Sequence, residues 1–151
     1  MIPFYIRPMT EDDIPEAPIL AFDNLDEFYS KDIFRLFLQQ WPGGQHVACH
    51  YNGDVVGFIC GSDLGPDRVG ITLFVVDRKN RGFGIGSKLL STLRLRGALK
   101  GAHTVSLEVR KENENAIDFY KKRGFVESET LVSYYRNGGD AIRMIGLCGP
   151  N

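Results

Sequence analysis

The sequence predicts an α/β (α+β) fold formed by one domain over residues 1–151. Strand-like apolar runs alternate with amphipathic runs of helical period, and no repeat, linker or low-complexity tract divides the chain. A glycine-rich turn connects one of the strand-like runs to an amphipathic run. A length of 151 residues with 43% apolar content is sufficient for one sizeable core.

The first part of the chain is predicted to form a strand and two helices. Residues 4–7 alternate as a strand, and Thr10 with Asp13 three residues later resembles a capping box for the helix that follows. A second helix is predicted over residues 30–40 because apolar residues recur on one face. These residues are Ile33, Phe34, Phe37 and Leu38.

A hairpin and a central strand are predicted next. Strands at 47–51 and 55–60 flank Asn52-Gly53-Asp54, which is a strong signal for a tight turn. The apolar run at 71–76 is predicted to be the central strand. The remaining predicted elements are a helix at 87–100, a strand at 105–110, a helix at 115–123, and closing strands at 129–136 and 141–147 that meet across 137–139.

The turn Arg81-Gly82-Phe83-Gly84-Ile85-Gly86 is the most informative feature of the sequence. Glycines let backbone N–H groups converge without obstruction by Cβ atoms, and the N-terminus of the following helix adds a positive potential. The turn therefore predicts a site for a phosphate-bearing ligand. Taken alone, a loop needed only for tight packing of strand against helix is an equal alternative.

Two longer patterns occur in order along the chain. The first, Arg/Gln-x-x-Gly-x-Gly/Ala, is formed by Arg81, Gly84 and Gly86. The second, Asn-x-x-Ala-x-x-x-Tyr-x-x-x-Gly-Phe, is formed by Asn113, Ala116, Tyr120, Gly124 and Phe125. With both patterns, the chain resembles the GNAT superfamily of acetyl-CoA-dependent N-acetyltransferases.

Three further segments resemble the protein N-terminal acetyltransferases, which include the ribosomal-protein alanine acetyltransferases. They are Leu107-Glu108-Val109-Arg110, Gln40-Trp41-Pro42-Gly43 followed by Val47-Ala48, and Tyr134-Tyr135 followed by Asp140-Ala141-Ile142-Arg143-Met144. The resemblance covers nearly the whole chain, so residues 1–151 are interpreted as one GNAT domain. One departure is Arg78, at a position where many members have proline.

The resemblance implies acetyl-CoA as cosubstrate and a mixed, strongly twisted sheet flanked by about four helices. The middle strands, 71–76 and 105–110, are expected to splay so that the pantetheine arm inserts between them. Backbone groups would bind that arm, and an N–H at the end of the first strand would polarise the thioester carbonyl. The implied cosubstrate-binding residues are Phe74, Val75, Val76, Arg81, Gly82, Phe83, Gly84, Ile85, Gly86, Ser87 and Asn113.

Glu108 is the candidate general base. Strand alternation places it on the face opposite Leu107 and Val109, where a carboxylate is usually just solvated. The resemblance implies catalysis, because the glutamate of Leu-Glu-Val-Arg holds the base position in the ribosomal-protein alanine acetyltransferases. A free α-amine has a pKa of about 8, so the demand on this base is modest.

Tyr120 is the candidate general acid. Its helical spacing with Ala116 and Ile117 is also typical of a core residue. The resemblance implies that its hydroxyl protonates the departing CoA sulfur. Asn113 could cap the following helix or contact the cosubstrate, and Asn115 competes for the capping role.

Substrate recognition is predicted in two loops. Matching regions of N-alpha-acetyltransferases clamp the peptide N-terminus, and a tyrosine hydroxyl can bond peptide main chain while its ring packs against a side chain. The alternative is that one tyrosine of the pair faces the core. The implied residues are Glu27, Phe28, Tyr29, Tyr134 and Tyr135.

Composition excludes several other classes of function. A formal net charge of -1 gives no general attraction to nucleic acid or a membrane surface. Cys49, Cys60 and Cys148 are widely spaced, and without a Cys-x-x-Cys pair or clustered histidines we predict no metal site and no disulfide framework. The absence of a secretory leader or a long apolar run predicts a cytoplasmic protein.

The sequence therefore predicts transfer of an acetyl group to protein N-terminal α-amines by direct attack in a ternary complex. The partner is a protein or peptide N-terminus, with a ribosomal protein as one candidate. The chain is expected as a monomer or weak homodimer, and an auxiliary subunit is compatible with the sequence. The alternatives are acetylation of a small amine or a lysine side chain, and a noncatalytic acyl-CoA-binding module.

Overall fold

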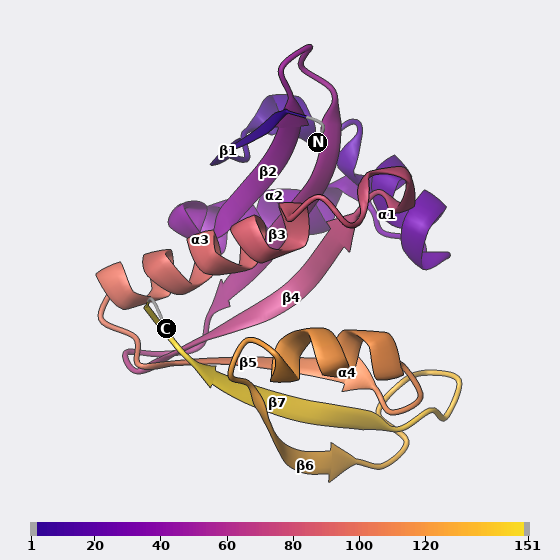
Figure 1. Cartoon of the computed structure of the whole chain (residues 1–151), viewed down its shortest axis with the longest axis vertical. Coiled ribbons are helices and arrows are strands. Elements are labelled where there is room, and N and C mark those ends of the chain that lie inside the picture. Colours follow the sequence, from indigo (N-terminus) through magenta and orange to yellow (C-terminus); the bar gives the residue numbers. More distant parts are fainter. Residues whose placement is uncertain (1–2, 150–151) are drawn as a thin grey trace.

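The computed structural model describes residues 3–149, which form one mixed sheet with helices on both faces (Figure 1). The spatial order of the strands is β1-β2-β3-β4-β5-β7-β6. The predicted α/β fold with a mixed sheet is confirmed. Its strands are β1 (Phe4–Pro8), β2 (Gln45–His50), β3 (Val55–Asp63), β4 (Arg68–Val76), β5 (Thr104–Arg110), β6 (Val126–Leu131) and β7 (Ala141–Leu147).

Four α-helices cover the two faces of the sheet within the described residues. They are α1 (Ala17–Leu25), α2 (Lys31–Gln40), α3 (Ile85–Leu99) and α4 (Glu114–Lys121). Short 3-10 turns lie at Glu11–Asp13, Pro42–Gly44 and Arg78–Asn80. One core cluster joins the sheet to α3 and α4, and a second joins its other face to α1 and α2. Phe34 of α2 is fully buried, as the apolar face predicted for that helix requires.

The middle of the sheet is split. Strands β4 and β5 run parallel and pair at Arg68–Thr104, Val69–Val105 and Gly70–Ser106. Beyond Gly70 they diverge (Figure 1), whereas β4 stays paired with β3 and β5 with β7. The register between β3 and β4 also shifts where Cys60 and Gly61 face Leu73 and Ile71, which leaves Thr72 as an extra residue. One edge of β4 is therefore open over its C-terminal half.

The predicted boundaries of α3 and β6 are wrong. Gly84 has a φ of 85° and caps α3, so the helix begins at Ile85 and not at residue 87. The strand predicted at 129–136 lies at Val126–Leu131, because the left-handed Ser133 turns the chain out of the sheet. Tyr134 and Tyr135 consequently lie in the loop between β6 and β7.

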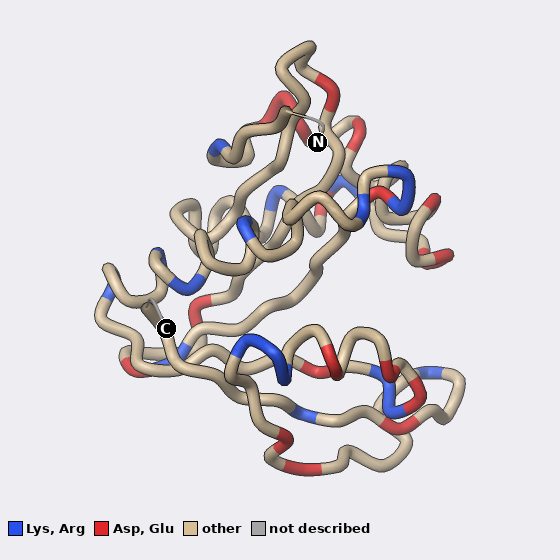
Figure 2. Tube along the Cα trace, viewed as in Figure 1, with Lys and Arg blue, Asp and Glu red and all other residues tan. Residues whose placement is uncertain are grey.

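Charged side chains of both signs are interspersed along the chain (Figure 2). In residues 3–149 no helix combines the length and the apolar character that crossing a membrane requires.

Candidate active site

Two cavities lie beside the split in the sheet. The first, about 580 Å³, is bounded by the end of β4, the glycine turn and one side of α4. The second, about 420 Å³, is bounded by the start of β4, by β5 and β7, and by the loop that carries Tyr134. Val105, Leu107 and Val109 of β5 belong to the core beneath α3 and α4, so alternation directs Glu108 toward the other face. The split sheet thus separates two chambers.

The backbone of the glycine turn is open to the first cavity. Gly82 and Gly84 have φ values of 87° and 85°, a region that side chains with a Cβ rarely adopt. The space that a Cβ would occupy at either glycine is empty to 4 Å. The turn ends at the first turn of α3, whose leading N–H groups lack intrahelical partners. The predicted residues Arg81, Gly82, Gly84, Ile85, Gly86 and Ser87 all line the first cavity.

Two predicted cosubstrate residues are not among those that line this cavity. The N–H of Asp77 donates to Val56 of β3, so alternation along β4 turns the backbone of Val75 toward β3 as well. The backbones of Phe74 and Val76 then face the open edge. Both residues line the cavity, but Val75 and Phe83 do not.

Asn113 caps α4 and lies at the first cavity. Its side chain accepts a hydrogen bond of 3.2 Å from the N–H of Ala116, which makes it the cap of α4 in preference to Asn115. Asn113 also lines the first cavity. The α4 N-terminus therefore lies at the same cavity as the glycine turn.

Arg123 is a residue of this cavity that the sequence did not indicate. Its Nε lies 3.1 Å from Oγ of Ser87, in the first turn of α3, and its guanidinium stacks 3.7 Å from the ring centroid of Phe119. A cation is thereby held beside the helix N-terminus. Local patterns could not reveal a contact between residues 36 positions apart, although a basic residue directly before Gly124 was a weak signal.

Tyr120 belongs to the core and also lies at the first cavity. Its side chain is 8% exposed and packs against Phe74 and Phe125, with ring centroids 6.5 and 5.4 Å away. It also lines the first cavity. Burial raises the pKa of the Tyr120 hydroxyl, so this group keeps its proton in the neutral range.

Glu108 lines the second cavity and is held from two sides. Its Oε2 lies 3.1 Å from Nε of Arg143, and its Oε1 accepts a 3.3 Å hydrogen bond from the Tyr134 hydroxyl. Tyr134 and Tyr135 line the same cavity, and their rings meet edge to face at 5.1 Å. This chamber places a carboxylate acceptor for a proton among hydroxyl groups suited to peptide main chain.

Two of the other predicted clamp residues, Glu27 and Tyr29, lie on one side of Arg110. Tyr29 donates a 2.6 Å hydrogen bond to Glu27, and Glu27 lies 3.7 Å from the Arg110 guanidinium. Arg110 also stacks 4.0 Å from the ring centroid of Tyr135. Burial and the bond to Glu27 raise the pKa of Tyr29. Arg110 thus joins the two loops that the sequence assigned to peptide binding.

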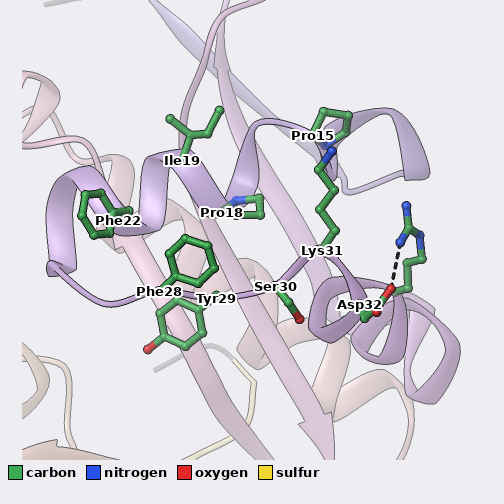
Figure 3. Close-up of a pocket in the computed structure, with 10 residues that line it drawn as sticks. Pro15, Pro18, Ile19, Phe22, Phe28, Tyr29, Ser30, Lys31 and Asp32 are labelled. Carbon is green, nitrogen blue, oxygen red and sulfur yellow. Dashed lines mark hydrogen bonds and ion pairs between the residues drawn. The ribbon is translucent and has the colours of Figure 1, made fainter.

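Phe28 does not join this group. Its side chain is 86% exposed and meets Phe22 edge to face, with ring centroids 6.5 Å apart. Figure 3 shows Phe28 beside Phe22 and Pro18 in a groove of about 690 Å³ between α1 and the start of α2, which Tyr29 also lines. The structure therefore brings Glu27 and Tyr29, but not Phe28, toward Tyr135.

The sheet splits beside a glycine turn that leads into α3, which is the arrangement expected from the sequence for a transferase with a phosphate-bearing donor. The model of the acetyltransferase (GNAT) family matches residues 8–125, and the chain belongs to this family. N-alpha-acetyltransferase 30 of Schizosaccharomyces pombe is 35% identical over 125 residues, which cover 81% of this chain and 83% of that relative. N-alpha-acetyltransferase 30 of Homo sapiens is 31% identical over 143 residues, which cover 93% of this chain but 40% of the relative.

Solved structures share the same architecture. Ard1 from Thermoplasma volcanium superimposes with a TM-score of 0.91 at 33% identity, over 97% of this chain and 99% of that one. One chain of the NatC complex bound to Gag peptide and CoA superimposes with a TM-score of 0.86 at 26% identity. The superposition covers 97% of this chain and 99% of that one. The predicted GNAT fold is confirmed, and the chain is an acetyl-CoA-dependent acetyltransferase.

Proposed function

We propose that this enzyme transfers the acetyl group of acetyl-CoA to the α-amine at protein N-termini, by direct attack in a ternary complex. The observation that carries the proposal is the second chamber, where Glu108 and two tyrosines lie across the split sheet from the glycine turn. Support also comes from relatives that are named N-alpha-acetyltransferases. The NatC structure, which holds a peptide and CoA, supports a peptide acceptor.

The cosubstrate would lie in the first chamber. Its diphosphate would meet the glycine turn and the N–H groups at the start of α3, with Arg81 and Arg123 as nearby cations. Backbone groups of Phe74 and Val76 would bind the pantetheine arm along the open edge of β4. The empty space at Gly82 and Gly84 fits a ligand that approaches the backbone closely.

The acceptor would enter from the second chamber. Glu108 takes a proton from the α-ammonium group, directly or through water, and the freed nitrogen attacks the thioester carbonyl carbon. As the new C–N bond forms and the C–S bond breaks, the sulfur takes the proton of the Tyr120 hydroxyl. The nitrogen gives up its second proton to become the amide, and that proton restores the Tyr120 hydroxyl through water. Among the described residues, no cysteine lines either chamber, so a cysteine nucleophile is not part of the proposed mechanism.

Initial rates with acetyl-CoA and acceptor both varied would test the proposal. Direct attack predicts intersecting reciprocal plots and an unmodified enzyme by mass spectrometry after incubation with acetyl-CoA alone. Peptides with a free N-terminus should be better acceptors than polyamines. Parallel plots with an acetylated enzyme would contradict the ternary complex, and a preference for polyamines would contradict the acceptor class. An auxiliary subunit and a cytoplasmic location stay predictions.

A further inference from the structure

Three charged residues form a row across the last three strands of the sheet. Arg143 on β7 is directly opposite Glu108 on β5 and directly opposite Glu129 on β6. Its Nε lies 3.1 Å from Oε2 of Glu108, and its Nη1 lies 2.6 Å from Oε1 of Glu129. Directly opposed side chains of a sheet interact strongly, so the backbone register itself aims the guanidinium at Glu108.

Unlike an ordinary surface ion pair, this row of charged residues lies at the second chamber. The Arg143 and Glu108 side chains are 31% and 26% exposed, and both residues line the second chamber. Glu129 is not part of that lining and is 52% exposed. Glu129 therefore holds one side of the guanidinium from outside, while the other side faces the carboxylate in the chamber.

The contacts leave Glu108 little freedom. Arg143 holds Oε2 and Tyr134 holds Oε1, so both carboxylate oxygens have a donor from a separate element. A free glutamate side chain has three rotatable bonds, and a misplacement of about 1 Å in a reacting group can cost about 100-fold in rate. A carboxylate that is already fixed avoids that loss.

We propose that Arg143 is a positioning residue for this reaction, which holds Glu108 in the orientation that accepts the proton of the acceptor amine. The inference rests on the proposed role of Glu108 as the base. Arg143 acts through Glu108 and does not itself exchange a proton, since its hydrogen bond to Glu108 raises the pKa of the guanidinium. Glu129 fixes Arg143 in turn.

A double-mutant cycle separates this role from a general contribution to the fold. In the wild-type background, Arg143→Met should lower kcat for a free-N-terminus peptide about tenfold, with the peptide KM changed less than about twofold. In the Glu108→Gln background the same substitution should change kcat less than about twofold, because the group that it positions is gone. Arg143→Lys should recover part of the loss, since an ammonium group can still reach one oxygen.

The matched control is Arg35→Met. Arg35 also bridges two carboxylates, those of Glu11 and Asp32, but it lies outside both chambers. Its substitution should leave kcat unchanged in both backgrounds, and thermal unfolding should show that every variant is folded.

Each other result of the cycle overturns the inference. Equal losses from Arg143→Met in the two backgrounds would mean that Arg143 acts independently of Glu108. A rise in peptide KM with constant kcat would make Arg143 a peptide-binding residue. Wild-type turnover in Arg143→Met would remove it from the site. Wild-type turnover in Glu108→Gln would overturn the base assignment in the proposed function, and the positioning role with it.

Discussion

Tyr134 donates a 3.3 Å hydrogen bond to Oε1 of Glu108, across 26 residues of sequence. A residue predicted to bind the peptide thus contacts the residue predicted to be the base. Burial and the negative charge of Glu108 raise the pKa of the Tyr134 hydroxyl, so it stays a donor through the neutral range. In the proposed mechanism, the Tyr134 side chain therefore serves both peptide binding and the orientation of Glu108.

Tyr134→Phe should lower turnover about tenfold, since one hydrogen bond to a charged group contributes about 1.5 kcal/mol or more. The ring would keep its edge-to-face contact with Tyr135. Steady-state kinetics with a peptide acceptor would measure the change. Tyr51→Phe, at a tyrosine that is 73% exposed on the hairpin turn, is the control and should behave as wild type. Unchanged turnover in Tyr134→Phe would show that the bond to Glu108 has no part in catalysis.

Tyr120→Phe tests the acid. The substitution keeps the ring contacts with Phe74 and Phe125 and removes only the hydroxyl. Turnover should fall about 100-fold, while the Kd for acetyl-CoA changes less than about twofold. Calorimetry gives the Kd, and a rate assay under conditions where chemistry is limiting gives the turnover. Wild-type turnover would leave Tyr120 as a core residue only.

Gly84→Val tests the anion turn. The φ of 85° at Gly84 is unfavourable for valine, and the new side chain would point into space that is empty to 4 Å. Acetyl-CoA binding should weaken at least about tenfold, or about 1.4 kcal/mol. The matched control is Gly53→Val, because Gly53 has a φ of 100° and the same open space but lies on the hairpin turn. If Gly84→Val and Gly53→Val have the same Kd for acetyl-CoA, the anion site lies elsewhere.

His46 should make stability depend on pH. Burial, with a smaller effect of Arg96, lowers the pKa of His46 to about 4, and its Nδ1 is buried without a hydrogen-bond partner. The unfolded chain binds this proton near pH 6.5, so the free energy of unfolding should fall between pH 7 and pH 5 by about 2 kcal/mol. The loss should level off below about pH 4, where both states are protonated. Denaturant titrations at the two pH values check this, and His46→Gln should remove that part of the decrease. An identical decrease in the variant would contradict the assignment.

Elements with strong local signals could be predicted from the sequence. The turn Asn52-Gly53-Asp54 joins β2 to β3, and the N–H of Thr10 donates to Oδ2 of Asp13 at 2.8 Å, as the capping box requires. The box opens a 3-10 turn at Glu11–Asp13 and not the predicted helix, because α1 begins only at Ala17. Both signals consist of residues that interact within a few positions. The end of β6 was mispredicted, because the turn depends on Ser133, a residue type with no strong preference for positive φ.

Contacts between distant segments could not be predicted in this way. Arg143 and Glu108 are 35 residues apart and meet only because β7 pairs with β5 in one particular register. The strand pattern placed Glu108 on a polar face but could not name its partner. Similarly, nothing in the run of Glu27, Phe28 and Tyr29 indicates that the Phe28 ring would contact Phe22 while the Tyr29 hydroxyl bonds to Glu27.

Two peptides of one sequence with an internal lysine, one of them blocked at its N-terminus, would show whether the acceptor is an α-amine. The free peptide should be acetylated at its α-amine, and the blocked peptide should react at least about 100-fold more slowly, because the two amines differ in pKa by about two units. Comparable rates for the two peptides, with acetyl groups on lysine, would contradict an α-amine acceptor.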